Sequence, residues 1–385
     1  MDRFDYIIAG GGAAGLSLAY QLVHSSLRDR RILVVDRDKK QANDRTWCFW
    51  TTRPTFFNSI YFRSWQKVAV RSEGFTRTFD LGDFRYNMLR GIDFYSLVLQ
   101  DLSVRPNVEI LTADIQQILD TPEGVQVTAG GQSYQADWAF DSRFNPADWA
   151  MRPDRYHYLK QHFTGWEVET ETEVFDPSLP VLFDFRAAQE GGLHFFYTLP
   201  FSATEALVEY TVFSADLLSP SAYEEQLGHY LTGTLKIGPY QVRAVEKGII
   251  PMSDHPFPRR LGDHTLAIGT LGGRVKASTG YAFLRIQADS AAIIRSLEQH
   301  GHPFAIKPEK PRYRLFDSIL LQILYRQGNQ AKPIFEQMFR NNPIQRVFEF
   351  LDESANWLDN YRFIASLPPL PFLKALVRLK LLHRI

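Results

Sequence analysis

The fold of this chain is decided near its N-terminus by the stretch Tyr6-Ile7-Ile8-Ala9-Gly10-Gly11-Gly12-Ala13-Ala14-Gly15. Its first four residues form an apolar run that is typical of a buried strand. The glycine-rich part is followed by apolar residues at helical spacing from Leu16 to Val23. A second apolar run, Ile32 to Val35, ends at Asp36. The pattern predicts a strand, a helix and a second strand that form one βαβ unit.

Each glycine of the pattern Gly10-x-Gly12-x-x-Gly15 has a physical role in binding a dinucleotide. Gly10 permits a tight turn, Gly12 lets the backbone approach a pyrophosphate, and Gly15 lets the helix pack closely on the sheet. The helix N-terminus faces the phosphate charge, and a terminal acid can accept hydrogen bonds from a ribose. A chance glycine-rich turn would lack this context, so we interpret the unit as Rossmann-type. The residues expected to contact the dinucleotide are Gly10, Gly12, Ala13, Ala14, Gly15, Asp36 and Arg37.

A second glycine-rich segment indicates which dinucleotide binds. Residues 267–273 end a predicted strand and precede a predicted helix. Many flavoproteins bring a second loop against the ribityl chain and flavin ring at this position, although an ordinary glycine turn is the alternative. A dinucleotide motif at the extreme N-terminus also favours FAD. We expect further contacts from Gly269, Thr270, Gly272 and Gly273, and contacts to cofactor or backbone from Asp141 at the end of another predicted strand.

Composition excludes several other classes of protein. The chain has 385 residues, with 43 Lys plus Arg and 43 Asp plus Glu, and this neutral balance argues against a nucleic-acid partner. One cysteine, Cys48, excludes a disulfide scaffold, and the histidines lack metal-site spacing, so we expect no metal. An aromatic content of 14% suggests aromatic-lined space for an apolar ligand. No apolar run is long enough to span a bilayer, which predicts a cytoplasmic protein, soluble or on a membrane surface.

The predicted fold class is α/β, with a Rossmann-type FAD-binding domain like that of glutathione reductase and the flavin hydroxylases. Residues 1–60, 90–145 and 246–300 are expected to form this domain discontinuously. An inserted, antiparallel β-rich substrate domain is expected from residues 61–89 and 146–245, where β-prone runs alternate with turns. Residues 301–385 are expected to form a helical C-terminal region.

Taken together, several sequence blocks resemble the lycopene cyclase family, flavoproteins that close the ends of linear carotenoids. The blocks are Asn43–Trp50, Phe140–Arg143, Gln161–Val168, Phe183–Phe185, Phe196–Pro200, Ala206–Thr211, Gly248–Met252 and Gly272–Phe283. Two departures are visible: Tyr210 stands where the family usually has a second carboxylate, and Ala277 replaces a proline. Gly269-Thr270 also differs from the Gly-Asp of the flavin hydroxylases, which favours the cyclases.

The resemblance implies an activity, a cofactor state and a set of site residues. The activity is an isomerisation that turns lycopene, or a related linear carotenoid, into a β-ring carotene, with FAD kept reduced by NAD(P)H. Glu209 lies in the acidic block and is implied as the acid that protonates the alkene, with Asp184 of second rank. Arg45, Thr279 and Gly280 are implied as further cofactor contacts.

The residues around Glu209 also suggest a role for it, independently of the family resemblance. On a strand, alternation sends Leu207 and Glu209 to one face and Val208 and Tyr210 to the other. A carboxylic acid in such apolar surroundings keeps its proton, and nearby aromatic faces stabilise a cation. The alternative is an ordinary solvated strand glutamate. Glu167 and Glu169 are expected to lie on an exposed strand face.

Three rival functions remain open: an FAD- and NAD(P)H-dependent monooxygenase of an apolar terpenoid or aromatic, a prenyl-chain reductase, and a non-catalytic carotenoid-binding flavoprotein. The segment Phe372–Ile385 is basic and amphipathic. It is expected either to dock on the core or to bind a membrane surface, with its cations on anionic headgroups.

Overall fold

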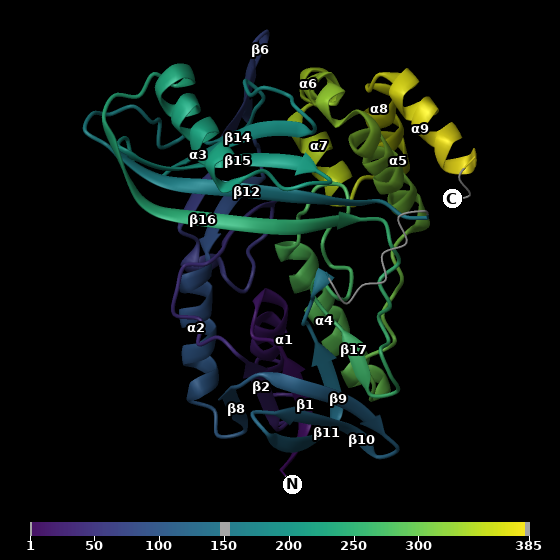
Figure 1. Cartoon of the computed structure of the whole chain (residues 1–385). Coiled ribbons are helices and arrows are strands. Elements are labelled where there is room, and N and C mark those ends of the chain that lie inside the picture. Colours follow the sequence, from purple (N-terminus) through teal and green to yellow (C-terminus); the bar gives the residue numbers. More distant parts are fainter. Residues whose placement is uncertain (1, 147–154, 382–385) are drawn as a thin grey trace.

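The computed structural model describes residues 2–146 and 155–381, and two large sheets dominate it (Figure 1). The first sheet has the strand order β8-β2-β1-β11-β10-β9, with β17 beside β11. Its strands are β1 (Arg3–Ala9), β2 (Ile32–Asp36), β8 (Val108–Thr112), β9 (Ile115–Thr121), β10 (Gly124–Ala129), β11 (Gln132–Asp141) and β17 (Thr265–Ala267). The central pairs β8-β2, β2-β1, β1-β11 and β11-β17 are parallel, as the βαβ prediction requires.

Helices cover one face of this sheet, and the sheet's own antiparallel strands cover part of the other. The helices are α1 (Ala13–Val23), α2 (Gly91–Ser103) and α4 (Phe283–His300). Their apolar sides share one core with Ile8 and Val34. On the opposite face, Ile7 and Val35 pack with Val125 and Val127 of β10. Both faces of β1 and β2 are therefore buried, which explains why these strands are continuous apolar runs rather than alternating ones.

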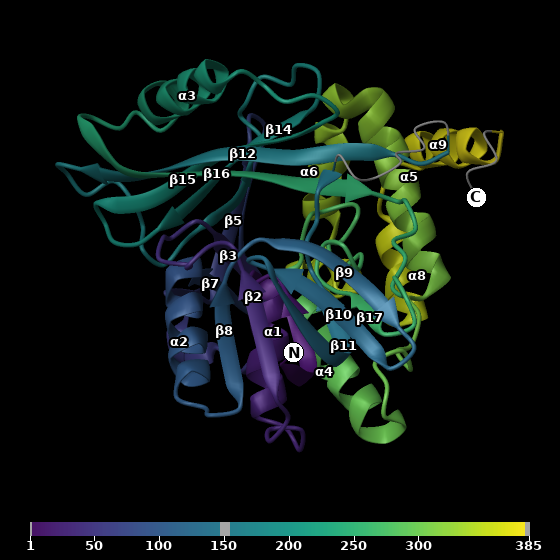
Figure 2. The same ribbon diagram turned by 60° about the horizontal axis from the view of Figure 1, so that its bottom comes forward.

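The second sheet lies across the first sheet and its helices (Figure 2). Its strand order is β16-β12-β15-β14-β13-β5-β6. Its strands are β5 (Lys67–Ser72), β6 (Phe75–Asp80), β12 (Tyr158–Thr170), β13 (Val181–Asp184), β14 (Leu193–Pro200), β15 (Glu205–Ser214) and β16 (Tyr240–Ser253). Helix α3 (Pro220–His229) covers one face, where Tyr223 and Leu227 pack on Val208 and Tyr210. Leu207 and Phe213 of β15 belong to a separate core on the other face.

A small third sheet separates the two cores. It consists of β3 (Thr46–Thr51), β7 (Arg85–Arg90) and β4 (Arg63–Trp65). Because side chains alternate along β3, Trp47 and Phe49 point into the core between the first sheet and its helices. Cys48 and Trp50 point the opposite way, into the core shared with the second sheet. Strand β3 therefore forms a wall that contacts both halves of the molecule.

The C-terminal region is helical, as predicted. It contains α5 (Pro311–Gln327), α6 (Lys332–Asn341), α7 (Ile344–Leu351), α8 (Trp357–Ala365) and α9 (Pro369–Leu381). Phe335, Phe339 and Phe348 from these helices complete the core of the second sheet. Across residues 2–146 and 155–381, no helix combines the length and the apolar character needed to cross a membrane. The predicted domain boundaries stay a prediction; part of the range 146–245 lies outside the described residues.

Candidate functional site

The sequence-predicted cofactor residues meet at one edge of the first sheet. In the pairing register, Ala9 lies beside both Val35 and Asp141, and Asp141 lies beside Ala267. Because β1, β2, β11 and β17 run parallel, the residues that follow them emerge together. Gly10, Asp36, Asp141 and Gly269 therefore share the carboxyl edge, which is where open α/β sheets bind ligands.

The first glycine loop has the geometry that a bound pyrophosphate requires. Gly10 has φ +104°, a conformation that favours glycine. A Cβ on Gly15 would lie 1.9 Å from the Gly10 carbonyl oxygen, so only glycine lets α1 approach the strand this closely. A Cβ on Gly12 would meet nothing within 4 Å. The space beside Gly12, at the start of α1, is therefore open to a phosphate group.

The terminal acid of β2 is held against this loop. The Gly11 N–H donates to Asp36 Oδ2 at 2.5 Å. Arg37 is exposed beside it, and the exposed Arg45 donates from Nη1 to the Asp44 carbonyl oxygen at 2.7 Å. Neither arginine is locked against the loop. The structure thus brings Asp36 to the site and leaves cofactor contacts of Arg37 and Arg45 as predictions.

The second loop packs directly on the first. A Cβ on Gly269, which has φ +59°, would lie 2.7 Å from the Cβ of Ala14. Thr270 follows on this loop, and the Gly273 N–H donates to its carbonyl oxygen. A Cβ on Gly272 would lie 2.5 Å from the Ala267 carbonyl oxygen. Asp141 is buried here, and its carboxylate accepts two hydrogen bonds of 2.9 Å from the Arg143 guanidinium, which leaves it a role in shaping the edge.

The loop ahead of α4 leaves two buried polar atoms without a protein partner. Thr279 Oγ1 and Gln161 Oε1 are buried and make no hydrogen bond within the described part of the chain. They lie around the same turn, because a Cβ on Gly280 would come within 2.2 Å of Gln161 Oε1. A buried polar group without a protein partner can form its hydrogen bond with a bound ligand or with water. Together with the open space at Gly12, these two atoms fit a bound FAD.

A row of four residues crosses the second sheet above this edge. In the pairing register, Tyr197 of β14 lies opposite Glu209 of β15, Glu209 opposite Gly165 of β12, and Gly165 opposite Glu246 of β16. Directly opposed residues point to the same face of a sheet. Tyr197, Glu209 and Glu246 therefore share one face, and Gly165 adds no side chain between the two acids.

Glu209 is half-buried. Burial of its carboxyl group is the main influence on its pKa, while part of the residue remains accessible to solvent. Thr211 Oγ1 donates to Glu209 Oε1 at 2.6 Å. Burial, reinforced by the negative charge of Glu246, raises the pKa of Glu209 to about 8. The prediction that Leu207 and Glu209 share one face is confirmed, because Leu207 lies in the core on this side.

Aromatic side chains and Cys48 surround this carboxyl. The hydroxyl groups of Tyr197 and Tyr281 lie close enough to act on each other's pKa, and the pKa of each is raised, first by burial and also by the Glu209 charge. Tyr281 also packs edge-on against Trp50 at 4.6 Å between ring centroids. Burial raises the pKa of the Cys48 thiol, and the negative charges of Glu209 and Glu246 raise it further. The result is an apolar, aromatic setting for the acid.

Glu246 is a site residue that the sequence reasoning missed. Its Oε1 accepts the Thr46 N–H at 2.9 Å, and its Oε2 accepts the Thr46 Oγ1 hydroxyl at 2.6 Å. Burial raises the pKa of Glu246, and the donors from Thr46 and the charge of Arg45 oppose that rise. The position of Glu246 in a strand-rich segment was visible in the sequence. Its pairing with Gly165, 81 positions earlier in the numbering, was not.

The other acids suggested by the sequence do not belong to this row. Asp184 pairs with Phe196, and both face the α3 side, away from Glu209. Its fully buried carboxylate accepts the Arg186 Nε–H at 2.8 Å and the Tyr230 hydroxyl at 2.8 Å. Glu167 and Glu169 are half-buried rather than exposed, since β16 pairs along β12 through both of them. The structure therefore does not bring Asp184 into contact with Glu209.

Tyr210 also faces α3, and its hydroxyl is 2.5 Å from His194 Nδ1. Tyr210, which stands where the family usually has a second carboxylate, therefore does not change the face of the sheet that carries Glu209.

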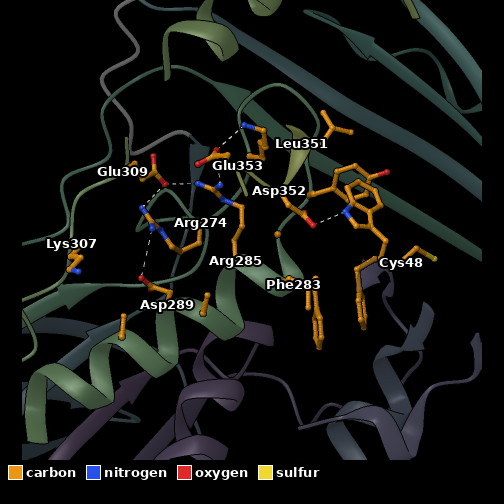
Figure 3. A pocket seen from close by; sticks show the side chains of 18 of the residues that line it. Cys48, Arg274, Phe283, Arg285, Asp289, Lys307, Glu309, Leu351, Asp352 and Glu353 are labelled. Atoms are coloured by element: carbon orange, nitrogen blue, oxygen red, sulfur yellow. Dashed lines mark hydrogen bonds and ion pairs between the residues drawn. The ribbon is translucent and has the colours of Figure 1, made fainter. Parts of the chain in front are cut away.

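A cavity of about 400 Å³ is lined by residues of β3, of α4 and of the loop ahead of it (Figure 3). Cys48, Trp50, Tyr281 and Phe283 line its apolar end, and Arg274, Arg285, Glu309 and Glu353 form ion pairs at the other. Between them, Trp50 Nε1 donates to Asp352 Oδ2 at 2.7 Å. Burial raises the pKa of Asp352 to about 7. The cavity and Glu209 share Cys48 and Tyr281 as neighbours.

The described residues contain no cluster of three or more His, Cys, Asp or Glu side chains placed to hold a metal ion.

The solved structures that resemble this fold define its class. A geranylgeranyl bacteriochlorophyll reductase-like protein from Thermoplasma acidophilum has a TM-score of 0.61 at 10% identity, over 99% of this chain and 100% of that chain. A variant of HpxO from Klebsiella pneumoniae, solved with FAD, has a TM-score of 0.63 at 14% identity, over 91% and 98%. The fold is that of the FAD-dependent reductases and monooxygenases, as predicted.

Sequence comparison then narrows the class to one family. The family model for lycopene cyclase protein matches residues 5–377, so the chain belongs to the lycopene cyclase family. The lycopene beta-cyclase of Paracoccus sp. is 25% identical over 394 residues, covering 95% of each chain. That of Pseudescherichia vulneris is 24% identical over 387 residues, again covering 95% of each. The resemblance in the sequence blocks is confirmed.

Proposed function

We propose that this protein is a carotenoid end-group cyclase that converts linear lycopene, or a close relative, into a β-ring carotene without net oxidation or reduction. The observation that carries the proposal is the buried Glu209 carboxyl, whose pKa is raised to about 8. It therefore holds a proton at neutral pH. The groups that set this pKa, among the described residues, include no cation that would force the carboxyl to ionise.

Cyclisation needs a proton donor, a stabilised cation and the exclusion of water. The Glu209 carboxyl gives its proton to the terminal alkene, and the tertiary cation that forms is attacked by an internal double bond to close the ring. One proton then leaves the ring, so the product has the mass of the substrate. Burial keeps water, a competing nucleophile, away from the cation.

The aromatic side chains beside Glu209 support the same chemistry. Electron-rich ring faces attract cations, most strongly where water is absent. Tyr197 lies directly opposite Glu209 in the sheet, and Tyr281 lies in the loop ahead of α4, where burial and nearby charges that include Glu209 raise its pKa. These two rings and Trp50 are the groups that we expect to stabilise the cation.

FAD is the proposed cofactor, bound at the carboxyl edge of the first sheet. Gly10, Gly12, Ala13, Ala14 and Gly15 would hold the pyrophosphate, Asp36 the ribose, and the two loops Gly269–Gly273 and Thr279–Gly280 the flavin end. When bound and reduced, FAD supplies electron density close to the cation. We further propose NAD(P)H as the reductant that maintains this state. The support is the family membership and the fit of the glycine loops.

The test is an anaerobic incubation of the purified protein with lycopene in liposomes and chemically reduced FAD, followed by chromatography and mass spectrometry. We expect a product of unchanged mass with a shifted absorption spectrum. Glu209→Gln should lower its formation by at least about 10²-fold, because the amide cannot donate a proton to an alkene. The matched control is Glu205→Gln, which changes an exposed glutamate on the same strand.

Three outcomes would contradict the proposal. Unchanged lycopene under these conditions, with a product one oxygen heavier when air and NADPH are added, would identify a monooxygenase instead. Full cyclisation by Glu209→Gln would exclude Glu209 as the acid. A product with fewer double bonds would indicate a prenyl-chain reductase.

We also propose that the protein works in the cytoplasm, peripherally bound to the membrane that holds its substrate. Helix α9 buries Ala375 and Leu379 against α5 and exposes the apolar stripe Leu370, Leu373, Val377 and Leu381. The cations Lys374, Arg378 and Lys380 are exposed next to this stripe. Residues 382–385 of the predicted segment lie outside the described residues. This arrangement matches an interfacial helix that places apolar side chains in lipid and cations on headgroups.

A further inference from the structure

We propose that Glu246 is the base that removes the ring proton, so that Glu209 and Glu246 serve as proton donor and proton acceptor on one row of the sheet. This inference rests on the proposed cyclase function and adds the residue that ends the reaction. Glu246 also gives this face of the sheet a second carboxyl group, although Tyr210 carries none and lies on the opposite face.

The first argument is the position of Glu246. Glu209 and Glu246 are two strands apart, in register across Gly165, which puts their backbones roughly 10 Å from each other. Both side chains extend from the same face of the sheet. The atoms that gain and lose protons belong to one six-membered ring, so donor and acceptor must reach the same small volume. Gly165 adds no side chain between the two acids, and a Cβ added there would lie 3.0 Å from Leu207 Cδ1 and 3.5 Å from Glu209 Cβ.

The second argument is the difference in hydrogen bonding between the two acids. Glu246 accepts one hydrogen bond on each oxygen, from the N–H and the hydroxyl of Thr46. A carboxylate has about four acceptor positions, so lone pairs remain to accept a proton. Glu209 accepts one hydrogen bond, from the Thr211 hydroxyl. Hydrogen bonds to a charged form favour that form, so Glu246 is the better carboxylate and Glu209 the better acid.

The third argument is the set of charges around the two groups. Arg45 is the cation that acts on Glu246, and Glu167 acts against it from β12. Around Glu209 the groups are Cys48, Tyr197 and Tyr281, all of which keep their protons because burial raises the pKa of each. The cation therefore lies on the Glu246 side of the row. Mutual repulsion further disfavours two charges on the row at once.

The proton balance closes over one turnover. Glu209 loses its proton to the terminal alkene carbon and becomes a carboxylate. After ring closure, the Glu246 carboxylate takes a proton from a ring carbon, whose C–H electron pair forms the new ring double bond. Glu246 is then the acid, and exchange with water after product release returns the proton to Glu209. No oxidant or reductant is consumed.

The position of the base also decides which ring forms. The tertiary ring cation has three neighbouring carbons that carry hydrogen, and each gives a different double-bond isomer. A base fixed by Thr46 can reach one of them. Without it, the cation loses protons from any neighbouring carbon or captures water. A residue that only ties β16 to β3 would leave the choice of isomer unchanged.

The experiment compares Glu246→Gln, Thr46→Val and the control Glu205→Gln with the wild-type holoenzyme, each under the liposome conditions above. We expect Glu246→Gln to retain FAD but to cyclise about 10²-fold more slowly and to give a mixture of double-bond isomers and products one water heavier. Thr46→Val, which removes one donor to Glu246, should give a smaller shift towards the same mixture. Glu205→Gln should match the wild type.

The two proposals fail in different ways. If the wild type forms no ring, the cyclase proposal is wrong. The inference about Glu246 is then wrong as well, because it rests on that proposal. If the wild type forms one β-ring isomer and Glu246→Gln forms the same isomer, at any rate, Glu246 is a structural tie and the inference is wrong. A mixture of isomers in Glu246→Gln with wild-type FAD content supports it.

Discussion

Two buried acids in this protein have opposite surroundings. Asp184 has a guanidinium and a phenol as partners, so its negative charge is compensated. Glu209 has a threonine hydroxyl, aromatic rings and a second carboxyl group, so burial raises its pKa. A buried charge without a cation is costly, and a carboxyl in that position avoids the cost by keeping its proton. The local setting thus turns one of two similar residues into an acid.

The raised pKa of Glu209 gives a pH dependence of defined sign. Below about pH 4.5 the carboxyl is protonated in both the folded and the unfolded chain, so it has no effect on stability. Between that pH and about pH 8, the unfolded chain ionises while the folded chain holds its proton, and the folded state loses stability as pH rises. Glu209→Gln removes this loss. We expect the melting temperature of Glu209→Gln, relative to wild type, to increase between pH 5 and pH 9.

Thermal unfolding of both proteins across this pH range checks the prediction. Glu205→Gln is the control, because it makes the same change at an exposed position on the same strand. Wild-type cyclisation should also decline above about pH 8, where Glu209 loses its proton. A constant difference in melting temperature between Glu209→Gln and wild type would contradict the raised pKa.

The first glycine loop shows how neighbouring glycines serve different purposes within one element. Gly15 is required by packing, since an added Cβ would overlap a backbone oxygen and a side chain of β1. Gly12 has an ordinary backbone conformation, with φ −82°, and open space around its Cβ position. Its lack of a side chain therefore has no value for the fold itself. The space is useful only to a bound group.

We expect Gly12→Val to fold and to lose FAD. The valine side chain would fill the space that the pyrophosphate needs and would strain nothing else. The prediction is a melting temperature for the flavin-free protein within a few degrees of flavin-free wild type, with FAD affinity lowered at least about 10²-fold, measured by flavin fluorescence. Gly15→Val is the matched comparison and should fail to fold. Normal FAD binding by Gly12→Val would mean that the dinucleotide lies elsewhere.

At the level of the whole molecule, exposed apolar side chains gather on the last two helices. Trp357 and Tyr361 of α8 are 74% and 66% exposed, and Leu370 and Leu373 of α9 are 67% and 56% exposed. Large apolar side chains grouped on a surface usually mark an interaction site. In Figure 1 these helices lie at one side of the molecule, next to the second sheet.

We expect replacement of Leu370, Leu373 and Val377 by serine to weaken membrane binding at least several-fold, because each loses apolar surface that lipid would cover. The measurement is co-sedimentation with vesicles that contain phosphatidylglycerol. The melting temperature should hardly change, since these side chains are exposed. Val104→Ser, at an exposed site that ends α2, is the control. Equal sedimentation of all three proteins would contradict the proposal.

The amino-acid sequence alone determined those features that depend on local pattern. Strand and helix periodicity predicted the βαβ unit, the glycine spacing predicted the dinucleotide site, and alternation on β15 predicted the face of Glu209. These signals lie within a few residues of one another, so no knowledge of distant neighbours is needed. The order of the family blocks along the chain also identified the lycopene cyclase family.

Only the tertiary structure decided which distant residues meet. The pairing of β12 with both β15 and β16 put Glu246 on the row of Glu209, and β3 brought Thr46 to it. The pairing of β13 with β14 put Asp184 on the α3 side, where Arg186 and Tyr230 donate hydrogen bonds to it. Register between strands far apart in sequence depends on the packing of the whole sheet, because a slip of one residue reverses every face. Local pattern carries no information about that choice.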